Sequence, residues 1–142
     1  MGFTLAHRRE HFCRAILEAS AYAVRDITDQ MLSMGLPLQE IRAVGGGARS
    51  PLWRQIKADV TSLPVSITET VETTALGAGI IALAGSGLIG SISEAVRLTT
   101  RVIETRDPDP KTRARYEEYY QLYRATYFSL LPVFERAAKI NP

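Results

Sequence analysis

The chain has 142 residues, of which 46% are hydrophobic and 23% charged, and a net charge of +2 from 17 basic and 15 acidic residues. This composition is typical of a soluble globular protein and argues against a disordered chain. No apolar run reaches the ~18 residues that a membrane span needs, so no membrane partner is expected. The length predicts one domain over residues 1–142, with a hydrophobic core of its own.

The distribution of charged residues argues against nucleic-acid binding. Opposite charges are mixed along most of the chain, as on a solvated surface, and no stacking aromatics are interleaved with Arg8 and Arg9. The single cysteine, Cys13, cannot form an internal disulfide, and its apolar helical surroundings predict a buried position. Because the N-terminus lacks a signal-peptide layout, we expect a cytoplasmic protein.

A long helix is predicted first, over residues 8–34. Its apolar residues recur in steps of three and four and form one stripe: Phe12, Ile16, Ala19, Ala23, Ile27 and Met31. Arg14 and Glu18 place opposite charges one turn apart. Gly35 followed by Pro37 predicts the end of this helix.

A short strand, a glycine run and a second helix follow. Residues 41–44 read as a buried strand that leads into the glycines at 45–47. Ser50 and Pro51 indicate a helix start, with a hydroxyl cap followed by proline at the first helical position. One face of this helix carries three apolar residues: Leu52, Ile56 and Val60. Residues 63–68 predict the next strand.

The next predicted helix, residues 72–84, is unusually rich in small residues. Its Gly77 and Gly79 indicate close approach to another backbone or to a ligand, because glycine inside a helix is otherwise unfavourable. Ser91 with Glu94 forms a capping-box pattern that opens a short helix.

The last third of the chain predicts one strand and one long helix. The strand covers residues 101–105, and the helix covers residues 111–139 with a bend at Pro132. An aromatic and apolar stripe runs along the helix and is typical of a packing surface: Tyr116, Tyr120, Tyr123, Tyr127, Leu131 and Phe134. The order of helices and strands predicts an α/β fold with a short, mostly parallel sheet flanked by helices.

The glycine run is the feature from which chemistry can be argued. Where a strand is followed by glycines and then by the start of a helix, the main chain can approach a nucleotide closely, because glycine has no side chain in the way. The N-terminus of the helix favours phosphate, since it carries free N–H groups and a partial positive charge. The run is not a P-loop, which ends in Gly-Lys-Ser/Thr, and Arg49 and Ser50 break the Rossmann spacing. From these residues alone, a plain strand-to-helix turn explains the glycines equally well.

Three segments resemble the FGGY family of carbohydrate kinases, in the order and spacing of that family. Residues 45–65, GGGARSPLWRQIKADVTSLPV, are similar to the adenosine-binding segment, especially that of xylulokinase-like members. Residues 72–79, ETTALGAG, resemble the following helix, and residues 11–18, HFCRAILE, resemble the tail of the second family signature.

The resemblance implies part of a ribonuclease-H-like, actin-like ATPase domain, with ATP held between two domains. Family members transfer the γ-phosphate of Mg²⁺-bound ATP to a sugar or polyol hydroxyl. The likeness places Gly46 and Gly47 at the adenine and ribose, with Gly45 alongside, and Ser50 where some relatives carry asparagine. The Ser50 hydroxyl can cap its helix or contact the nucleotide, but not both fully, and both interpretations stay open.

The resemblance begins part-way through a signature, at Met1. The family's N-terminal sugar-binding domain, its general-base aspartate and the first strands of its C-terminal domain have no counterpart in residues 1–142. Asp26 and Asp59 are interpreted as surface or capping charges, so no catalytic residue is predicted. His7 and His11 lie one turn apart without a third ligand, so no metal ligand is predicted either.

We therefore expect the ATP-binding portion of a carbohydrate kinase, inactive by itself, with Mg²⁺ bound together with the nucleotide in the complete enzyme. The alternative is an oligomerising interaction module, or a kinase remnant without useful ATP affinity. Missing strands would leave an unpaired sheet edge and uncovered helix faces. The expected partner is therefore a second copy of the chain or a separately encoded N-terminal kinase half.

Overall fold

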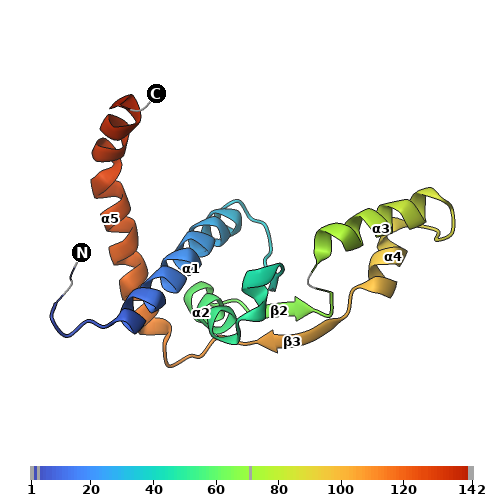
Figure 1. The fold of residues 1–142 in the computed structure, drawn as a ribbon, viewed down its shortest axis with the longest axis horizontal. Helices are drawn as coiled ribbons and strands as arrows, with labels where there is room; N and C mark the ends of the chain where they lie inside the picture. Colours follow the sequence, from blue (N-terminus) through green and yellow to red (C-terminus); the bar gives the residue numbers. More distant parts are fainter. Residues whose placement is uncertain (1, 3, 71, 141–142) are drawn as a thin grey trace.

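The computed structural model describes residues 2, 4–70 and 72–140 (Figure 1). In chain order the elements are α1 (Arg9–Ser33), β1 (Ile41–Ala43), the 3-10 helix η1 (Gly46–Arg49), α2 (Pro51–Thr61), β2 (Val65–Thr68), α3 (Thr73–Gly85), α4 (Ile92–Thr99), β3 (Val102–Arg106) and α5 (Arg113–Ile140). The predicted helices and strands are all present, which confirms the α/β class. The glycine run differs from expectation, because its last two glycines begin the 3-10 helix η1. We refer to residues 45–49 as the glycine turn.

The three strands form one sheet in the order β1-β2-β3. Strands β1 and β2 are parallel, with Ile41 opposite Val65, whereas β2 and β3 are antiparallel, with Val65 opposite Arg106. The sheet is therefore mixed, and the prediction of a mostly parallel sheet was wrong in this detail. Helices α3 and α4 fold back on each other beyond the carboxyl end of β2, so the chain re-enters the sheet from that end (Figure 1).

Helix α2 lies at the centre of the buried core. Its Ile56 and Val60 pack with residues of α1 and α5, namely Ala21, Tyr22, Tyr116 and Tyr120. On its other side, Ala58 packs with a second buried group from the sheet and the glycine turn: Ala43, Ala48 and Val65. Leu52 was predicted to share the buried face of Ile56 and Val60, but it lies in the first turn of α2 and is exposed.

The apolar stripe predicted on α1 faces away from this core. Ile16 and Ile27 are 69% and 62% exposed, and Phe12 is also exposed. The buried residues of α1 are Ala21, Tyr22 and Thr28, on the other side of the helix. Cys13 is exposed as well, so the prediction of a buried cysteine was wrong. Periodicity identified an apolar face but not whether anything in this chain covers it.

Helix α5 begins against α1 and then extends away from the body of the molecule (Figure 1). Tyr116 and Tyr120 are buried at the start of the helix, whereas Tyr127 and Phe134, further along the predicted stripe, are exposed. The helix continues through Pro132 without ending. None of the helices within residues 2, 4–70 and 72–140 combines the length with the apolar composition that a membrane span requires.

Candidate functional site

The glycine turn and the start of α3 lie at one edge of the sheet. Because β1 and β2 are parallel, their carboxyl ends meet at the same edge, where α/β proteins commonly bind ligands. β1 leads into the glycine turn and β2 leads into α3. An ion pair of 3.7 Å between Arg49 and Glu72 joins the two connections. The two segments that resemble nucleotide-binding motifs are therefore neighbours in space.

The first two glycines of the turn have open space beside the main chain. Gly45 has a φ of +76°, which favours glycine, and its carbonyl oxygen accepts a 3.0 Å hydrogen bond from the Ala48 amide. No atom lies within 4 Å of the position where a Cβ on Gly45 or Gly46 would be, and Gly46 is exposed. A ligand could therefore approach the backbone at this point.

Gly47 is in a different environment. A Cβ at this residue would lie 2.3 Å from Cζ3 of Trp53, so the indole ring already occupies the space beside it. The ring nitrogen Nε1 of Trp53 donates a 2.8 Å hydrogen bond to Ser20 Oγ on α1. The glycine at position 47 is therefore explained by packing, a distinction that the sequence did not reveal.

Ser50 is the N-cap of α2, as the sequence predicted. Its Oγ accepts a hydrogen bond of 3.3 Å from the backbone amide of Trp53. The capping interpretation of Ser50 is therefore confirmed. A hydroxyl that accepts one hydrogen bond still has its own proton to donate, so a contact between Ser50 and a ligand remains chemically possible.

Arg54 holds the glycine turn against the sheet. Its side chain is only 4% exposed, and it donates one hydrogen bond to the Ala48 carbonyl and another, of 2.6 Å, to Glu104 Oε2 on β3. Hydrogen bonds from Arg106 and Arg54 hold the pKa of the Glu104 carboxyl below its ordinary value. Arg54 was not among the residues predicted from the sequence. That Ala58, one helical turn along α2, faces the sheet is known only from the structure, so it offered no signal in advance.

The small residues of α3 are not explained by packing inside this chain. No atom lies within 4 Å of the Cβ positions of Gly77 and Gly79. Within the described residues, no other backbone makes the close approach that was predicted at these two glycines. The space beside them is open to a ligand or to another polypeptide.

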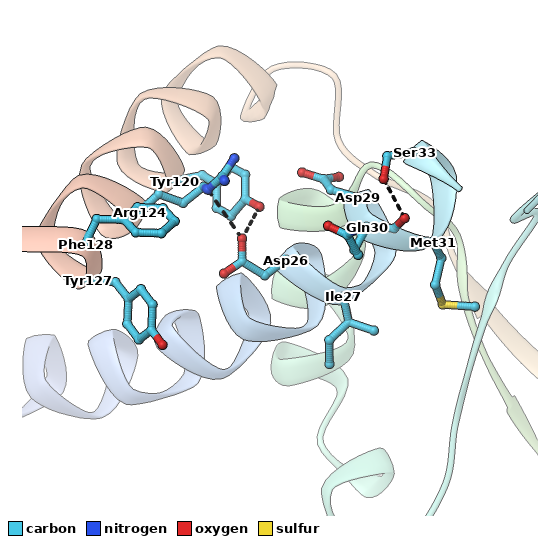
Figure 2. Close-up of a pocket in the computed structure, with 10 residues that line it drawn as sticks. All are labelled: Asp26, Ile27, Asp29, Gln30, Met31, Ser33, Tyr120, Arg124, Tyr127 and Phe128. Atoms are coloured by element: carbon cyan, nitrogen blue, oxygen red, sulfur yellow. Dashed lines mark hydrogen bonds and ion pairs between the residues drawn. The ribbon is translucent and has the colours of Figure 1, made fainter. Parts of the chain in front are cut away.

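A cavity of about 600 Å³ lies between α1 and α5, away from the glycine turn (Figure 2). Three of its polar side chains, Asp26, Tyr120 and Arg124, pair with one another. Tyr120 Oη donates a 2.6 Å hydrogen bond to Asp26 Oδ1, and Arg124 Nε lies 3.6 Å from the same oxygen. Asp26 therefore connects two helices, and the cavity is better explained by their divergence than by a ligand.

Asp59, the other carboxylate considered in the sequence, is buried. Its Oδ1 accepts hydrogen bonds of 2.8 Å from Gln55 Nε2 and from the backbone amide of Asp109. The interpretation of Asp59 as a surface charge was therefore wrong. Its contact with the Asp109 amide ties α2 to the turn that precedes α5, whereas its contact with Gln55 lies within α2, so Asp59 has a structural role.

Comparisons with known proteins agree with this geometry. Residues 1–86 match the C-terminal domain of the FGGY family of carbohydrate kinases. The chain is 31% identical over 127 residues to a xylulose kinase from Staphylococcus epidermidis, and 36% identical over 128 residues to a glycerol kinase from Xanthomonas euvesicatoria. These alignments cover 89% and 88% of the chain but only 26% of each relative.

A solved structure shows the same arrangement of elements. The chain superposes on the xylulose kinase from Rhodospirillum rubrum with a TM-score of 0.82 and 34% sequence identity. The superposition covers 95% of the chain and 28% of the kinase. The chain thus spans about a quarter of the length of the proteins that it matches.

Proposed function

This chain belongs to the FGGY family of carbohydrate kinases, and from that membership we propose that it is the ATP-binding portion of a kinase acting on a sugar or polyol hydroxyl. The observation that carries the proposal is the exposed main chain at Gly46, at the carboxyl end of β1 and just before α2. The relatives named xylulose kinase and glycerol kinase support an acceptor with several hydroxyl groups.

The adenine and ribose of ATP would lie against the open backbone of Gly45 and Gly46. Gly47 packs against Trp53, so its main role would be to maintain the shape of the turn, with little contact to the nucleotide. Ser50 would cap α2 and donate its own proton toward the ligand. The start of α2 carries a partial positive charge from the helix dipole, which favours an anionic ligand.

The phosphoryl transfer itself would need the rest of a kinase. Such transfer depends on an in-line hydroxyl, on charge stabilisation by Mg²⁺ bound with the nucleotide, and on a residue that orients the hydroxyl. In the described chain, Asp26 and Asp59 are engaged in helix contacts and are unsuited to orient a substrate hydroxyl. We therefore propose that residues 1–142 bind ATP but do not phosphorylate a sugar on their own.

Calorimetry with ATP tests the nucleotide site. Gly46→Val adds a side chain in open space at a backbone angle that valine tolerates, so it should block the ligand without unfolding the chain. Gly85→Val is the matched control, since it is also surrounded by open space but lies at the far end of α3. We expect Gly46→Val to weaken ATP binding at least about tenfold and Gly85→Val to leave it unchanged. Equal affinities of the two variants, or no ATP binding by the unmodified chain, would refute the site.

An activity assay tests the second half of the proposal. The chain is mixed with ATP, Mg²⁺ and a panel of pentoses, hexoses and polyols, and ADP release is followed. We expect no turnover above background, because Asp26 and Asp59 are engaged in helix contacts and leave no residue that we assign to orient a substrate hydroxyl. Robust turnover would show that this chain contains a catalytic residue that we have assigned to structure.

A second candidate function, an interaction module with no useful ATP affinity, is favoured by the large exposed surface. The chain exposes 10,282 Å², whereas a compact protein of 15.7 kDa is expected to expose about 7,300 Å². The excess of about 3,000 Å² is comparable to a large permanent interface. The partner would be a second copy or the N-terminal part of a kinase. Light scattering measures the molar mass of the purified chain and so distinguishes a monomer from a dimer. A stable dimer that binds no ATP would favour this second function.

A further inference from the structure

A second cavity, of about 520 Å³, lies between α1 and α5 toward the start of α1, and we name it the Tyr22 pocket. The residues of α1 that line it precede Asp26, whereas the cavity of Figure 2 is lined by Asp26 and by residues after it. Its volume is in the range of small-molecule sites, about 300–1,000 Å³. The glycine turn contributes no residue to its lining, so the pocket is separate from the candidate nucleotide site.

Tyr22, on the wall of this pocket, has a buried hydroxyl without a partner. The residue is only 6% exposed, and its ring packs against Tyr116, Tyr120 and Tyr123 of α5. No residue that the structure describes forms a hydrogen bond with Tyr22 Oη. In the cavity of Figure 2, by contrast, the Tyr120 hydroxyl is already paired with Asp26. Because a buried hydroxyl without a hydrogen bond is unfavourable, a ligand that supplies one gains affinity there.

Donors and acceptors are held in place beside Tyr22. Arg14 Nε donates a 2.7 Å hydrogen bond to Glu18 Oε1, one helical turn along α1. Tyr116 Oη donates a 3.1 Å hydrogen bond to the same carboxylate oxygen and accepts one of 2.5 Å from Arg14. Burial and the nearby charge of Glu18 raise the pKa of Tyr22, so its hydroxyl keeps its proton at neutral pH and can donate it.

The rest of the lining adds a further donor and aromatic faces. Nδ1 of His11 accepts a 3.0 Å hydrogen bond from the Arg8 amide, so the neutral ring carries its proton on Nε2. Tyr119 and Tyr123 line the pocket from α5, and Tyr119 is 54% exposed. A tyrosine ring offers an apolar face as well as a polar end. The pocket therefore combines several hydrogen-bonding groups with flat apolar surface.

The balance of charge in the lining favours an uncharged ligand. Among the described residues that line the pocket, the formally charged side chains are Arg14 and Glu18, and they form an ion pair with each other. A hydroxylated ligand can accept from Tyr22 and donate to Glu18, while its C–H groups lie on a tyrosine ring. We propose that the Tyr22 pocket binds an uncharged sugar or polyol, at a site additional to the candidate nucleotide site.

Calorimetry with matched neutral and charged probes tests the class of ligand. The full 142-residue chain is titrated with xylitol and D-glucose, and with D-xylonate and D-gluconate, which have the same numbers of carbon atoms but carry a carboxylate. We expect at least one neutral probe to bind and its charged counterpart to bind at least about tenfold more weakly, because the pocket holds no uncompensated cation. Binding of neither neutral probe, or tighter binding of the charged counterparts, would overturn the proposal.

The variant Tyr22→Phe tests the role of the unpaired hydroxyl, since it keeps the buried ring. We expect it to weaken binding of the neutral probe about three- to tenfold. The melting temperature of the ligand-free variant should be equal or higher, because no hydrogen bond within the described chain is lost. Tyr127→Phe, at an exposed position that lines the cavity of Figure 2, is the control and should change neither quantity. Unchanged affinity, or a lower melting temperature, of Tyr22→Phe would contradict the assignment.

ATP titrations separate this pocket from the nucleotide site. Tyr22→Phe should bind ATP as the unmodified chain does, and Gly46→Val should keep the affinity for the neutral probe, because the two positions belong to different sites. Loss of the neutral probe in Gly46→Val would show that one site binds both ligands and would overturn the proposal of an additional pocket. Absence of ATP binding by the unmodified chain would contradict the nucleotide proposal alone.

Discussion

Gly47 and Trp53 are packed in direct contact, so that a Cβ on Gly47 would come within 2.3 Å of the indole carbon Cζ3. The same indole reaches α1 through the hydrogen bond from its Nε1 to Ser20 Oγ. One side chain thus links the glycine turn, α2 and α1. The shape of the candidate nucleotide site therefore depends on a packing contact as well as on backbone freedom.

Replacing Gly47 by alanine should destabilise the chain. The added methyl group would overlap the Trp53 ring, and overpacking of this kind costs about 1–3 kcal/mol. Gly46→Ala is the control, since no atom lies within 4 Å of its Cβ position, and its effect should stay within about 0.5 kcal/mol. Urea unfolding followed by circular dichroism measures both. Equal stability of the two variants would show that the Gly47–Trp53 contact is relaxed in solution.

Ser50→Ala should remove the cap of α2. The loss of the hydrogen bond from the Trp53 amide is expected to lower the free energy of unfolding by about 1 kcal/mol. Ser50→Asn should cost almost nothing, because asparagine is an equally good cap. Thermal unfolding measures the difference. ATP titrations of the same two variants then show whether the hydroxyl also contacts the nucleotide, which the cap alone does not require.

Glu40 should make stability depend on pH in the acid range. Hydrogen bonds of 2.7 Å from Arg42 Nε and 2.8 Å from the buried Ser66 Oγ hold the pKa of the Glu40 carboxyl below its ordinary value. A folded-state pKa below the unfolded value of about 4.3 means that the stabilisation is complete above that pH and is lost as the pH falls through the folded pKa.

The variant Glu40→Gln tests this assignment. It should be less stable than the unmodified chain at pH 6, and the difference should shrink as the pH is lowered below about 4.3. The urea unfolding midpoints of both proteins are measured at a series of pH values from 6 to below about 4.3 and compared. Gln39→Ala, at an exposed position next to Glu40, controls for effects of substitution in general. A difference that is constant with pH would mean that the carboxylate charge plays no part.

Tyr120→Phe should loosen the attachment of α5. The substitution keeps the buried ring but removes the hydroxyl that donates to Asp26, and a hydrogen bond to a charged group is worth about 1.5–3 kcal/mol. Tyr119→Phe, at an exposed neighbouring position, should have almost no effect. Thermal unfolding followed in the aromatic circular dichroism reports both. A neutral Tyr120→Phe would mean that water replaces the hydroxyl without cost.

The elements that the sequence predicted correctly are those with strong local signals. Ser50 and Pro51 located the start of α2, and Ser91 located the start of α4, where its Oγ accepts a hydrogen bond of 3.1 Å from the Glu94 amide. The resemblance in three segments, residues 11–18, 45–65 and 72–79, identified the family, which the match over residues 1–86 confirms. Arg54 was missed because nothing near it in sequence shows that its partners, Ala48 and Glu104, would surround it.

By itself, the sequence determined where the helices and strands lie and to which family the chain belongs, since caps, glycines, periodicity and motifs act over a few residues. Only the tertiary structure decided the direction of β3, the separate roles of Gly46 and Gly47, and which face of α1 stays uncovered. These features depend on residues far apart in the chain, as Asp26 and Tyr120 are, 94 positions from each other. A local pattern contains no information about which distant surface will cover it.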